Sequence, residues 1–412
     1  MNDDHTEAAG PTATSETATP HRRNTHRRAV WMTIVATHLV LVLATVGGVV
    51  FTLNSLNGNI EDGASVEHKV EEVLPDGVAQ DAKKKPLNIL VMGSDSRVGD
   101  GNGIDGENED GSERSDTVIL LHVSRDRTNA YGISLPRDAM IDRPDCMVDG
   151  ETIPGESYVR FNTAFSVGGP VCTLQTVEQL TGIHVHHFVV LDFAGFKDMV
   201  DAVDGVEVCI PTEVDDDEHD IHFDAGTQVL DGDQALNYVR ERYQLSVTGD
   251  IGRMKRQQAF IASMIKKVSS AGTLSQPTRV YGFLDAVTNS IKVDDGLDTV
   301  DKLYDLAMEL RTTGPSSIRF ITVPILPDPN NPDVTLVWSE SADDLWELVK
   351  QDQKLGKDFT EGSIRANDDV GTTDEGDDEP TESPSDGETL SPEATERAEA
   401  QAQERRMAGL CV

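Results

Sequence analysis

Residues 240–258 bring several basic side chains together in a chain whose formal net charge is −38. The stretch reads RERYQLSVTGDIGRMKRQQ, and its basic residues are Arg240, Arg242, Arg253, Lys255 and Arg256. Arginine binds phosphate in a bidentate manner that lysine cannot match, because its guanidinium is planar. The segment therefore predicts a site for a phosphate-bearing anion. The common alternative is that these side chains only pair with nearby carboxylates such as Glu241 and Asp250.

A helix is expected to begin at Asp250, because apolar side chains recur with helical spacing after it. Arg253 lies three residues after Asp250 and Gln257 four residues after Arg253, so the three side chains share one face. The stripe predicted to face the core is Ile251, Met254, Gln258, Ile261, Ile265 and Val268. A carboxylate, a guanidinium and a carboxamide should therefore project together from the first two turns.

Two predicted strands carry aspartate and arginine at ends that would adjoin in a sheet. Asp95 and Arg97 follow the strand expected at 87–93, whereas Arg114 and Asp116 open the next strand. If the two strands are neighbours, both carboxylates meet at one sheet edge. A pair of carboxylates is what a protein usually offers Mg²⁺, or Mn²⁺ in its place, and substrate phosphates can complete the shell. Aspartates that only cap turns are the commoner alternative.

Two further turns carry arginine. The third predicted strand is followed by Arg137 and Asp138, and Arg160 and Asn162 precede two glycines and a helix. A helix N-terminus favours an anion, since its first backbone N–H groups have no partner within the helix. Both turns are therefore candidate contacts for the same anion.

Alternating strand and helix patterns must position these residues. The strands are expected at 87–93, 116–124, 129–135, 186–193, 206–210 and 318–325. The helices are expected at 169–182, 194–205, 231–242, 250–268 and 298–311. Most of the strands are apolar at successive positions, which indicates a sheet covered on both faces. The pattern predicts an α/β fold, a three-layer α/β/α sandwich with a mixed central sheet.

An apolar stretch at residues 29–53 contains no Lys, Arg, Asp or Glu. At about 1.5 Å rise per residue, a helix of this length exceeds the roughly 30 Å hydrocarbon core of a membrane. A cleaved signal peptide would have a shorter apolar region. Arginines precede the stretch and acidic residues follow it. We therefore expect a single-pass helix in the cell membrane, a cytoplasmic N-terminus and an extracytoplasmic C-terminal domain.

The composition divides the rest of the chain. Residues 1–28 are expected to form a disordered cytoplasmic tail, residues 54–86 a spacer outside the membrane, and residues 87–360 one globular domain. Residues 361–412 are acidic and rich in Pro, Ser and Thr, which predicts a second disordered tail.

All of the cysteines fall in the part expected outside the membrane, where disulfides persist. They are Cys146, Cys172, Cys209 and Cys411. Sequence alone does not choose among their possible pairings. We expect Cys146 to pair with Cys172, since Cys411 belongs to the predicted tail. Cys209 lies in a strand pattern and has the alternative of being a buried apolar residue.

Other polar groups carry weaker signals. Asp215, His219 and His222 fit no established metal spacing and are interpreted as solvated. His184 and His186 alternate on a predicted strand and are interpreted as structural.

Motifs in a fixed order, GSDSR, RSDT, SLPRD, RFNTAFSVGG and RERYQLSVTGDIGRMKRQQ, resemble those of the LytR-CpsA-Psr (LCP) family of bacterial envelope proteins. The resemblance covers about residues 87–270 and implies that residues 87–360 are the family's catalytic domain. It implies a glycopolymer–peptidoglycan phosphotransferase, which moves a glycopolymer from a polyprenyl-pyrophosphate lipid carrier to peptidoglycan. A long acidic insert after Arg97, and Arg160 in place of a frequent lysine, depart from the family pattern.

The resemblance also implies roles for the residues at matching positions. The expected catalytic set is Asp95, Asp116, Arg137, Arg240, Arg242, Asp250 and Arg253. The diphosphate is expected to contact Arg97, Arg114, Arg137, Arg160, Arg240, Arg242, Arg253, Arg256 and Gln257. Asp95 and Asp116 would hold Mg²⁺ or Mn²⁺, and Asp250 would hold the arginines or assist the acceptor.

Two other functions stay open at this stage. With water as the acceptor, the protein would be a polyprenyl-pyrophosphate hydrolase, or a transferase that has pyrophosphatase as a side activity. A non-catalytic, lipid-binding regulator of the envelope, a transcriptional attenuator, is the other alternative. The strongly negative charge argues against nucleic acid as a partner. Teichoic acid, capsule and arabinogalactan would share the diphosphate, so the sequence does not identify the glycopolymer.

Overall fold

The computed structural model describes most of the chain in two units, Met1–Ser55 and Leu56–Val412. The described residues are 23–60, 63–72, 74, 84–94, 113–216, 221–241, 245, 249–368, 402–403, 405–406 and 410–411, with the backbone alone for 23–28. Asp95, Arg97 and Arg242, which belong to the predicted site, lie outside the described residues.

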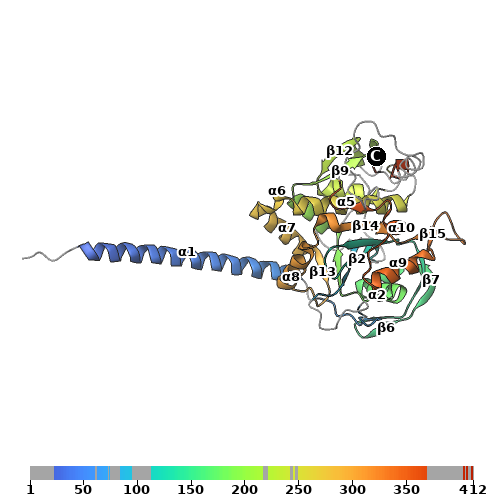
Figure 1. The fold of residues 1–412 in the computed structure, drawn as a ribbon, viewed down its shortest axis with the longest axis horizontal. Coiled ribbons are helices and arrows are strands. Elements are labelled where there is room, and N and C mark those ends of the chain that lie inside the picture. The colour runs from blue at the N-terminus through green and yellow to red at the C-terminus, as the bar shows by residue number, and fades with distance from the viewer. Residues whose placement is uncertain are drawn as a thin grey trace, which may run out of the picture. The chain divides into compact units, whose positions relative to one another are not determined.

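The helix α1 (Arg23–Asn59) contains the predicted apolar stretch (Figure 1). Its segment Ala29–Asn59 has a mean hydropathy of 2.3 over its most apolar window and is long and apolar enough to cross a membrane. Large apolar side chains such as Trp31 and Phe51 are exposed along it. Exposure of this kind suits a helix surrounded by lipid.

A seven-stranded sheet forms the centre of the second unit, in the order β13-β8-β1-β2-β3-β14-β17. Its strands are β1 (Leu87–Ser94), β2 (Ser115–Val123), β3 (Ala130–Leu135), β8 (His187–Leu191), β13 (Ile291–Val293), β14 (Ile318–Thr322) and β17 (Ile364–Arg365). β2 runs antiparallel to both β1 and β3, whereas β8 is parallel to β1 and β14 is parallel to β3. The prediction of a mixed central sheet is confirmed.

Helices cover both faces of this sheet. On one face, Leu90 and Met92 share a core with Leu174 of α2 (Thr163–Thr181) and Trp346 of α9 (Ser341–Lys350). On the other face, Ile89 packs with Leu306 of α8 (Val300–Arg311). α5 (Asp250–Ser269) and α7 (Pro277–Ser290) also pack there, and Figure 1 shows α5 on the opposite side of the strands from α2 and α9. The three-layer α/β/α sandwich follows from this alternation along the strands.

A second core lies on the outer side of α5. The helices α3 (Phe193–Ala202) and α4 (Gly232–Arg240) pack there with the paired strands β9 (Val206–Ile210) and β12 (Gly226–Leu230). Phe260 of α5 belongs to this cluster. The strand predicted at 206–210 therefore exists, but it pairs with β12 and stands outside the central sheet.

The remaining elements are short. They are β4 (Met140–Arg143), β5 (Cys146–Val148), β6 (Glu151–Ile153), β7 (Glu156–Arg160), β10 (Val214–Asp216), β11 (Ile221–Phe223), α6 (Ala271–Leu274), the 3₁₀ helix Pro315–Ser317, β15 (Ile325–Pro327), β16 (Leu336–Trp338) and α10 (Lys357–Thr360). The strand predicted at 318–325 is divided between β14 and β15. Pro324 lies between them and has no backbone N–H for a sheet ladder.

The expected disulfide between Cys146 and Cys172 is present and joins β5 to α2. A second disulfide joins Cys209 of β9 to Cys411. Cys209 is therefore not an unpaired apolar residue, and the reasoning that set Cys411 aside was wrong. The acidic composition of the sequence before Cys411 does not indicate that residues at this end pack on the domain. Leu410 is nevertheless buried beside Ala262 of α5.

Two predicted segments contain residues that pack on the domain. Within the predicted spacer, Ile60 is buried and Ala64 forms a β-bridge with Asp294. Within the predicted C-terminal tail, β17 adds the last strand to the central sheet by pairing with β14. The packed region therefore includes residues on both sides of 87–360.

Candidate functional site

Asp116 and Arg137 meet at one edge of the central sheet because of the register between two antiparallel strands. Val118 of β2 pairs with Leu135 of β3. Asp116 precedes this pair by two residues and Arg137 follows it by two, so they lie opposite each other. Arg137 Nη1 donates to Asp116 Oδ1 at 2.5 Å. The sheet thus fixes the first ion pair of the site.

The first turn of α5 supplies a second carboxylate and a second guanidinium. Arg137 Nη2 donates to Asp250 Oδ2 at 2.9 Å, and Arg137 Nε approaches the same oxygen at 3.1 Å. Arg253 Nη2 lies 3.2 Å from Asp250 Oδ1, and Arg253 Nη1 lies 4.0 Å from Asp116 Oδ2. Asp116, Arg137, Asp250 and Arg253 therefore form a closed ring of alternating charge, which we call the charge ring.

Gln258 holds α5 against the sheet one turn beyond the charge ring. Its amide Nε2 lies 2.9 Å from Ser134 Oγ, 3.0 Å from the Ile321 carbonyl oxygen and 3.0 Å from Thr322 Oγ1. These acceptors belong to β3 and β14, and the Gln258 side chain is buried. Sequence reasoning placed Gln258 in an apolar stripe and so missed its polar role. The only signal of this polar role in the sequence is that a glutamine occupies one position of an otherwise apolar stripe.

The N-terminus of α5 suits the residues it carries. Gly249, immediately before the helix, has φ of 55°, a conformation that other residues adopt at a cost. Asp250 lies in the first helical turn, where the helix dipole favours a negative charge. The local backbone therefore stabilises an ionised Asp250 facing Arg137.

The pKa values of two residues at the site are displaced. Burial alone would lower the pKa of Arg137, but Asp116 and Asp250 outweigh it and raise that pKa, so the guanidinium stays charged. Burial raises the pKa of Asp138, and the adjacent Asp250 carboxylate raises it further, while Arg137 opposes the shift. Asp138 Oδ2 accepts from Arg137 Nε at 3.2 Å. Asp138 is thus the carboxyl group in this cluster whose pKa is displaced toward the protonated form.

Other predicted anion contacts have different neighbours among the described residues. Arg160 is about half-exposed, and its Nε lies 3.6 Å from Asp138 Oδ1. Arg114 is exposed and stands two residues before Asp116. The guanidinium carbon of Arg240 lies 4.9 Å from the centre of the Phe193 ring, over its face. Asp95, Arg97 and Arg242, outside the described residues, are not placed.

Arg256 and Gln257 face the end of α4 instead. Arg256 is fully buried and donates through Nη2 to the Glu241 carbonyl oxygen, and burial lowers its pKa. Gln257 Nε2 donates to the Val239 carbonyl oxygen at 3.2 Å. These contacts give both residues a role in joining α4 to α5, and their expected contact with a diphosphate stays a prediction.

The predicted apolar stripe of α5 is only partly correct. Ile251, predicted to face the core, is 37% exposed, whereas Arg253 and Arg256 are buried. Helical spacing alone did not predict the burial of these two arginines, because α5 is covered by the sheet on one side and by α4 on another. Its buried surface is therefore wider than one stripe.

Chemically, the charge ring presents two fixed guanidinium groups and two carboxylates at a sheet edge, and the Asp138 carboxyl group lies beside them. Arg253 is 2% exposed and Arg137 is 16% exposed, so both are held before any ligand arrives. Such donors suit stabilisation of an anion that gains charge during a reaction.

Comparisons with known proteins show a family and a shared fold. The model of the LytR_cpsA_psr family matches residues 49–354. The cell wall biosynthesis protein LcpA of Corynebacterium glutamicum is 32% identical over 330 residues, which cover 72% of this chain and 60% of that protein. The polyisoprenyl-teichoic acid–peptidoglycan teichoic acid transferase TagU of Enterococcus faecalis is 35% identical over 222 residues, which cover 53% of this chain and 65% of that protein.

The chain thus spans less than two thirds of the length of these curated relatives. A solved structure of a Streptococcus agalactiae protein covers 66% of this chain and 90% of its own, with 24% identity and a TM-score of 0.53. That likeness shows a shared fold.

Proposed function

Because the chain belongs to the LytR-CpsA-Psr family, we propose that it is a membrane-anchored phosphotransferase that moves a glycopolymer from a polyprenyl-pyrophosphate carrier to peptidoglycan. The relatives named as teichoic acid transferases support this reaction class. The identity of the glycopolymer is not part of the proposal.

The charge ring is the observation that carries the proposal. A diphosphate offers several anionic oxygens, and Arg137 and Arg253 are guanidiniums fixed in place by Asp116 and Asp250. Two arginines and two aspartates sum to a formally neutral ring. A bound diphosphate therefore needs additional positive charge, and the exposed Arg114 and half-exposed Arg160 stand nearby to supply it.

A divalent ion would supply further charge. The Asp116 carboxylate is 22% exposed at the sheet edge, and carboxylate oxygens are what Mg²⁺ and Mn²⁺ prefer. Asp116, together with Asp95 outside the described residues, would hold the ion, which when bound would neutralise phosphate charge.

In the proposed reaction, a hydroxyl oxygen of peptidoglycan attacks the phosphorus that carries the glycopolymer. The bond from that phosphorus to the bridging oxygen breaks, and polyprenyl phosphate leaves with the electron pair. Arg137 and Arg253 stabilise the negative charge on the phosphoryl oxygens. Asp250 lies beside Arg137 and accepts the proton of the attacking hydroxyl. The new bond between that hydroxyl oxygen and the phosphorus makes the product a phosphodiester between polymer and peptidoglycan.

The membrane location belongs to the same proposal. α1 is the anchor, the N-terminal residues lie in the cytoplasm, and the α/β/α domain lies outside. The arginines before α1's apolar segment support this orientation through the positive-inside rule. The two disulfides support an oxidising compartment for the domain.

Purified full-length protein, a pyrophosphate-linked lipid glycan, peptidoglycan and Mg²⁺ provide the test. Glycan linked to peptidoglycan, with release of polyprenyl phosphate, is the expected result. Release of free glycan phosphate alone would make the protein a hydrolase. Tight lipid binding without any product would make it a lipid-binding regulator, and either outcome overturns the proposal.

A further inference from the structure

A second polar cluster lies at the opposite end of the central sheet from the charge ring. β8 is parallel to β1, with His187 paired to Ile89 near the start of β1. The charge ring, in contrast, lies beyond the other end of β1, where Ser94 pairs with Ser115. A strand of this length spans about 25 Å at about 3.3 Å per residue, so the two clusters are separate.

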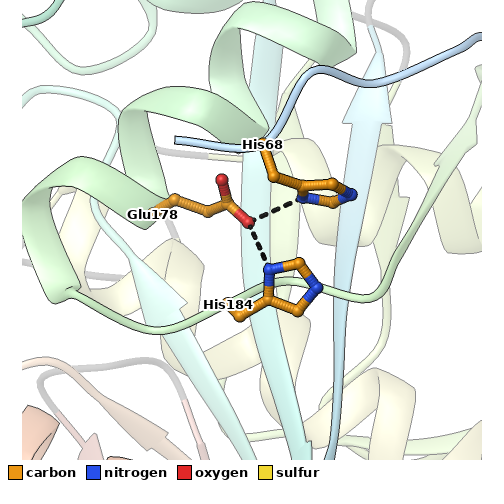
Figure 2. A group of neighbouring side chains, drawn as sticks. All are labelled: His68, Glu178 and His184. Carbon is orange, nitrogen blue, oxygen red and sulfur yellow. Dashed lines mark hydrogen bonds and ion pairs between the residues drawn. The ribbon is translucent and has the colours of Figure 1, made fainter. Parts of the chain in front are cut away.

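The cluster consists of His68, Glu178 and His184, and Figure 2 shows both imidazoles directed at one carboxylate oxygen. His68 Nδ1 lies 2.8 Å from Glu178 Oε1, and His184 Nδ1 lies 3.3 Å from the same atom. One ligand atom from each of the three residues falls within 4.8 Å of the others.

These three atoms are close enough together to bind one small tetrahedral ion, and His68 Nδ1 and Glu178 Oε1, now at hydrogen-bond distance, would move apart on binding. Zinc bonds of about 2.0–2.1 Å to nitrogen and oxygen place neighbouring ligand atoms about 3.3 Å apart. Two imidazoles and one carboxylate are an established donor set for zinc. Either ring nitrogen of histidine can bind a metal, so Nδ1 is an acceptable ligand.

The Glu178 carboxylate is held by backbone groups from two segments. Its side chain is fully buried. Oε2 accepts from the Lys69 N–H at 2.7 Å, and Oε1 accepts from the Val185 N–H at 3.0 Å. Such outer contacts orient a metal ligand and are typical of built metal sites.

A neighbouring cavity of about 240 Å³ gives access to the cluster. Glu72, His184 and His186 are among its lining residues. His186 is not a ligand in this arrangement, because its Nδ1 accepts from the Asn88 N–H at 3.0 Å and its Nε2 faces Glu72 at 3.5 Å.

We propose that Nδ1 of His68, Nδ1 of His184 and Oε1 of Glu178 bind a divalent transition metal ion of the zinc class. Without the ion, His68 Nδ1 donates to Glu178, and His184 Nδ1 lies 2.9 Å from the Val70 carbonyl oxygen. Binding of the ion requires each Nδ1 proton to leave, either to Nε2 of the same imidazole or to solvent. The metal then ties the segment 63–72 to α2 and to the loop before β8. This assignment is independent of the proposed transferase reaction.

The test uses metal-stripped, full-length protein in detergent and Zn²⁺ alone as the probe. Calorimetry should show one equivalent of zinc bound at this cluster, and His68→Gln should weaken that binding at least about 100-fold. His68 is 33% exposed, so its replacement should leave the fold intact, as far-UV circular dichroism can verify. His222→Gln is the matched control, because His222 is half-exposed and pairs with Asp215. It should bind zinc like the wild type.

X-ray absorption at the zinc edge gives a second reading that does not depend on a variant. Two imidazoles and one carboxylate oxygen at about 2.0–2.1 Å are expected. A wild-type protein that binds no zinc, equal binding by His68→Gln and the wild type, or a bound ion without imidazole ligands would each overturn the assignment.

Discussion

Arg137 Nη1 stands 2.5 Å from Asp116 Oδ1 across neighbouring antiparallel strands. The same guanidinium reaches Asp250 of α5 at 2.9 Å. One side chain therefore connects two strands of the sheet to the helix that carries the basic segment.

Replacing Arg137 by lysine tests the geometry without removing the charge. An ammonium group is a single point of charge and cannot bridge Asp116 and Asp250 as the fork does. We expect Arg137→Lys to lower the transfer rate by about 100-fold or more, the usual loss for one fixed donor. The rate is measured with lipid-linked glycan and peptidoglycan.

Arg279→Lys is the matched control for that change. Arg279 of α7 pairs with Asp204 on the surface of the domain, and neither residue belongs to the charge ring. Its replacement should leave the rate unchanged, since surface ion pairs contribute little. Equal rates for Arg137→Lys and the wild type would show that the guanidinium fork is not needed.

Replacing Gln258 tests how α5 is positioned. Gln258→Leu leaves Ser134 Oγ and the Ile321 carbonyl oxygen without their buried donor. The free energy of unfolding should fall by about 1–3 kcal/mol, the cost of unsatisfied buried groups. Urea unfolding measures it, with Gln276→Leu as the control, because among the contacts described the exposed Gln276 side chain donates only to the Gly272 carbonyl oxygen. Equal free energies of unfolding for Gln258→Leu and Gln276→Leu would show that Gln258 does not hold α5 against the sheet.

Much of the fold follows from local patterns in the sequence. The strand over 206–210 and the beginning of α5 at Asp250 were predicted where the structure has them. Apolar runs bounded by Gly, Asp or Pro carry that information locally. β2 and β3 form a hairpin closed by the turn at residues 124–129, but local patterns do not give its register, which places Asp116 opposite Arg137.

The remaining misses involve contacts between distant parts of the chain. Helical spacing does not show that Arg253 and Arg256 have different partners. Arg256 contacts the Glu241 carbonyl oxygen because the end of α4 lies beside it in the folded domain. Glu178 lies 110 residues from His68, and Cys209 lies 202 residues from Cys411. The helix or strand periodicity around each of these residues does not indicate which distant residue it contacts.

The second disulfide should contribute strongly to stability. The loop it closes spans 202 residues, and long loops gain the most from a cross-link in the chain-entropy account. Cys411→Ser should lower the free energy of unfolding by about 2–4 kcal/mol. Alkylation and mass spectrometry should find Cys209 as a free thiol in this variant and fully bonded in the wild type. An unreacted Cys209 in the variant would contradict the pairing.

The displaced pKa of Asp138 predicts a pH dependence of stability. Burial, and then the nearby Asp250 carboxylate, raises that pKa above its ordinary value of 3.8 in the folded protein. The stability from this group is therefore present below 3.8 and is lost as the pH rises through the folded value. Asp138→Asn removes the titration and should make the protein more stable than the wild type at pH ~7.

The difference between Asp138→Asn and the wild type should disappear below pH ~3.8, where Asp138 is protonated in both states. Urea unfolding across this pH range measures it. Asp305→Asn, at an exposed position on α8, is the control and should show no such trend. A variant less stable than the wild type at neutral pH would mean that the ionised carboxylate stabilises the site.

The central claim is that a sugar hydroxyl, and not water, receives the glycopolymer. The most direct measurement runs the reaction of full-length protein, lipid-linked glycan and peptidoglycan in water enriched in ¹⁸O, followed by mass spectrometry of both phosphate products. Transfer predicts polymer on peptidoglycan and no ¹⁸O in either the new phosphodiester or the released polyprenyl phosphate. Incorporation of one ¹⁸O into free polymer phosphate or into polyprenyl phosphate, without polymer on peptidoglycan, would contradict the claim.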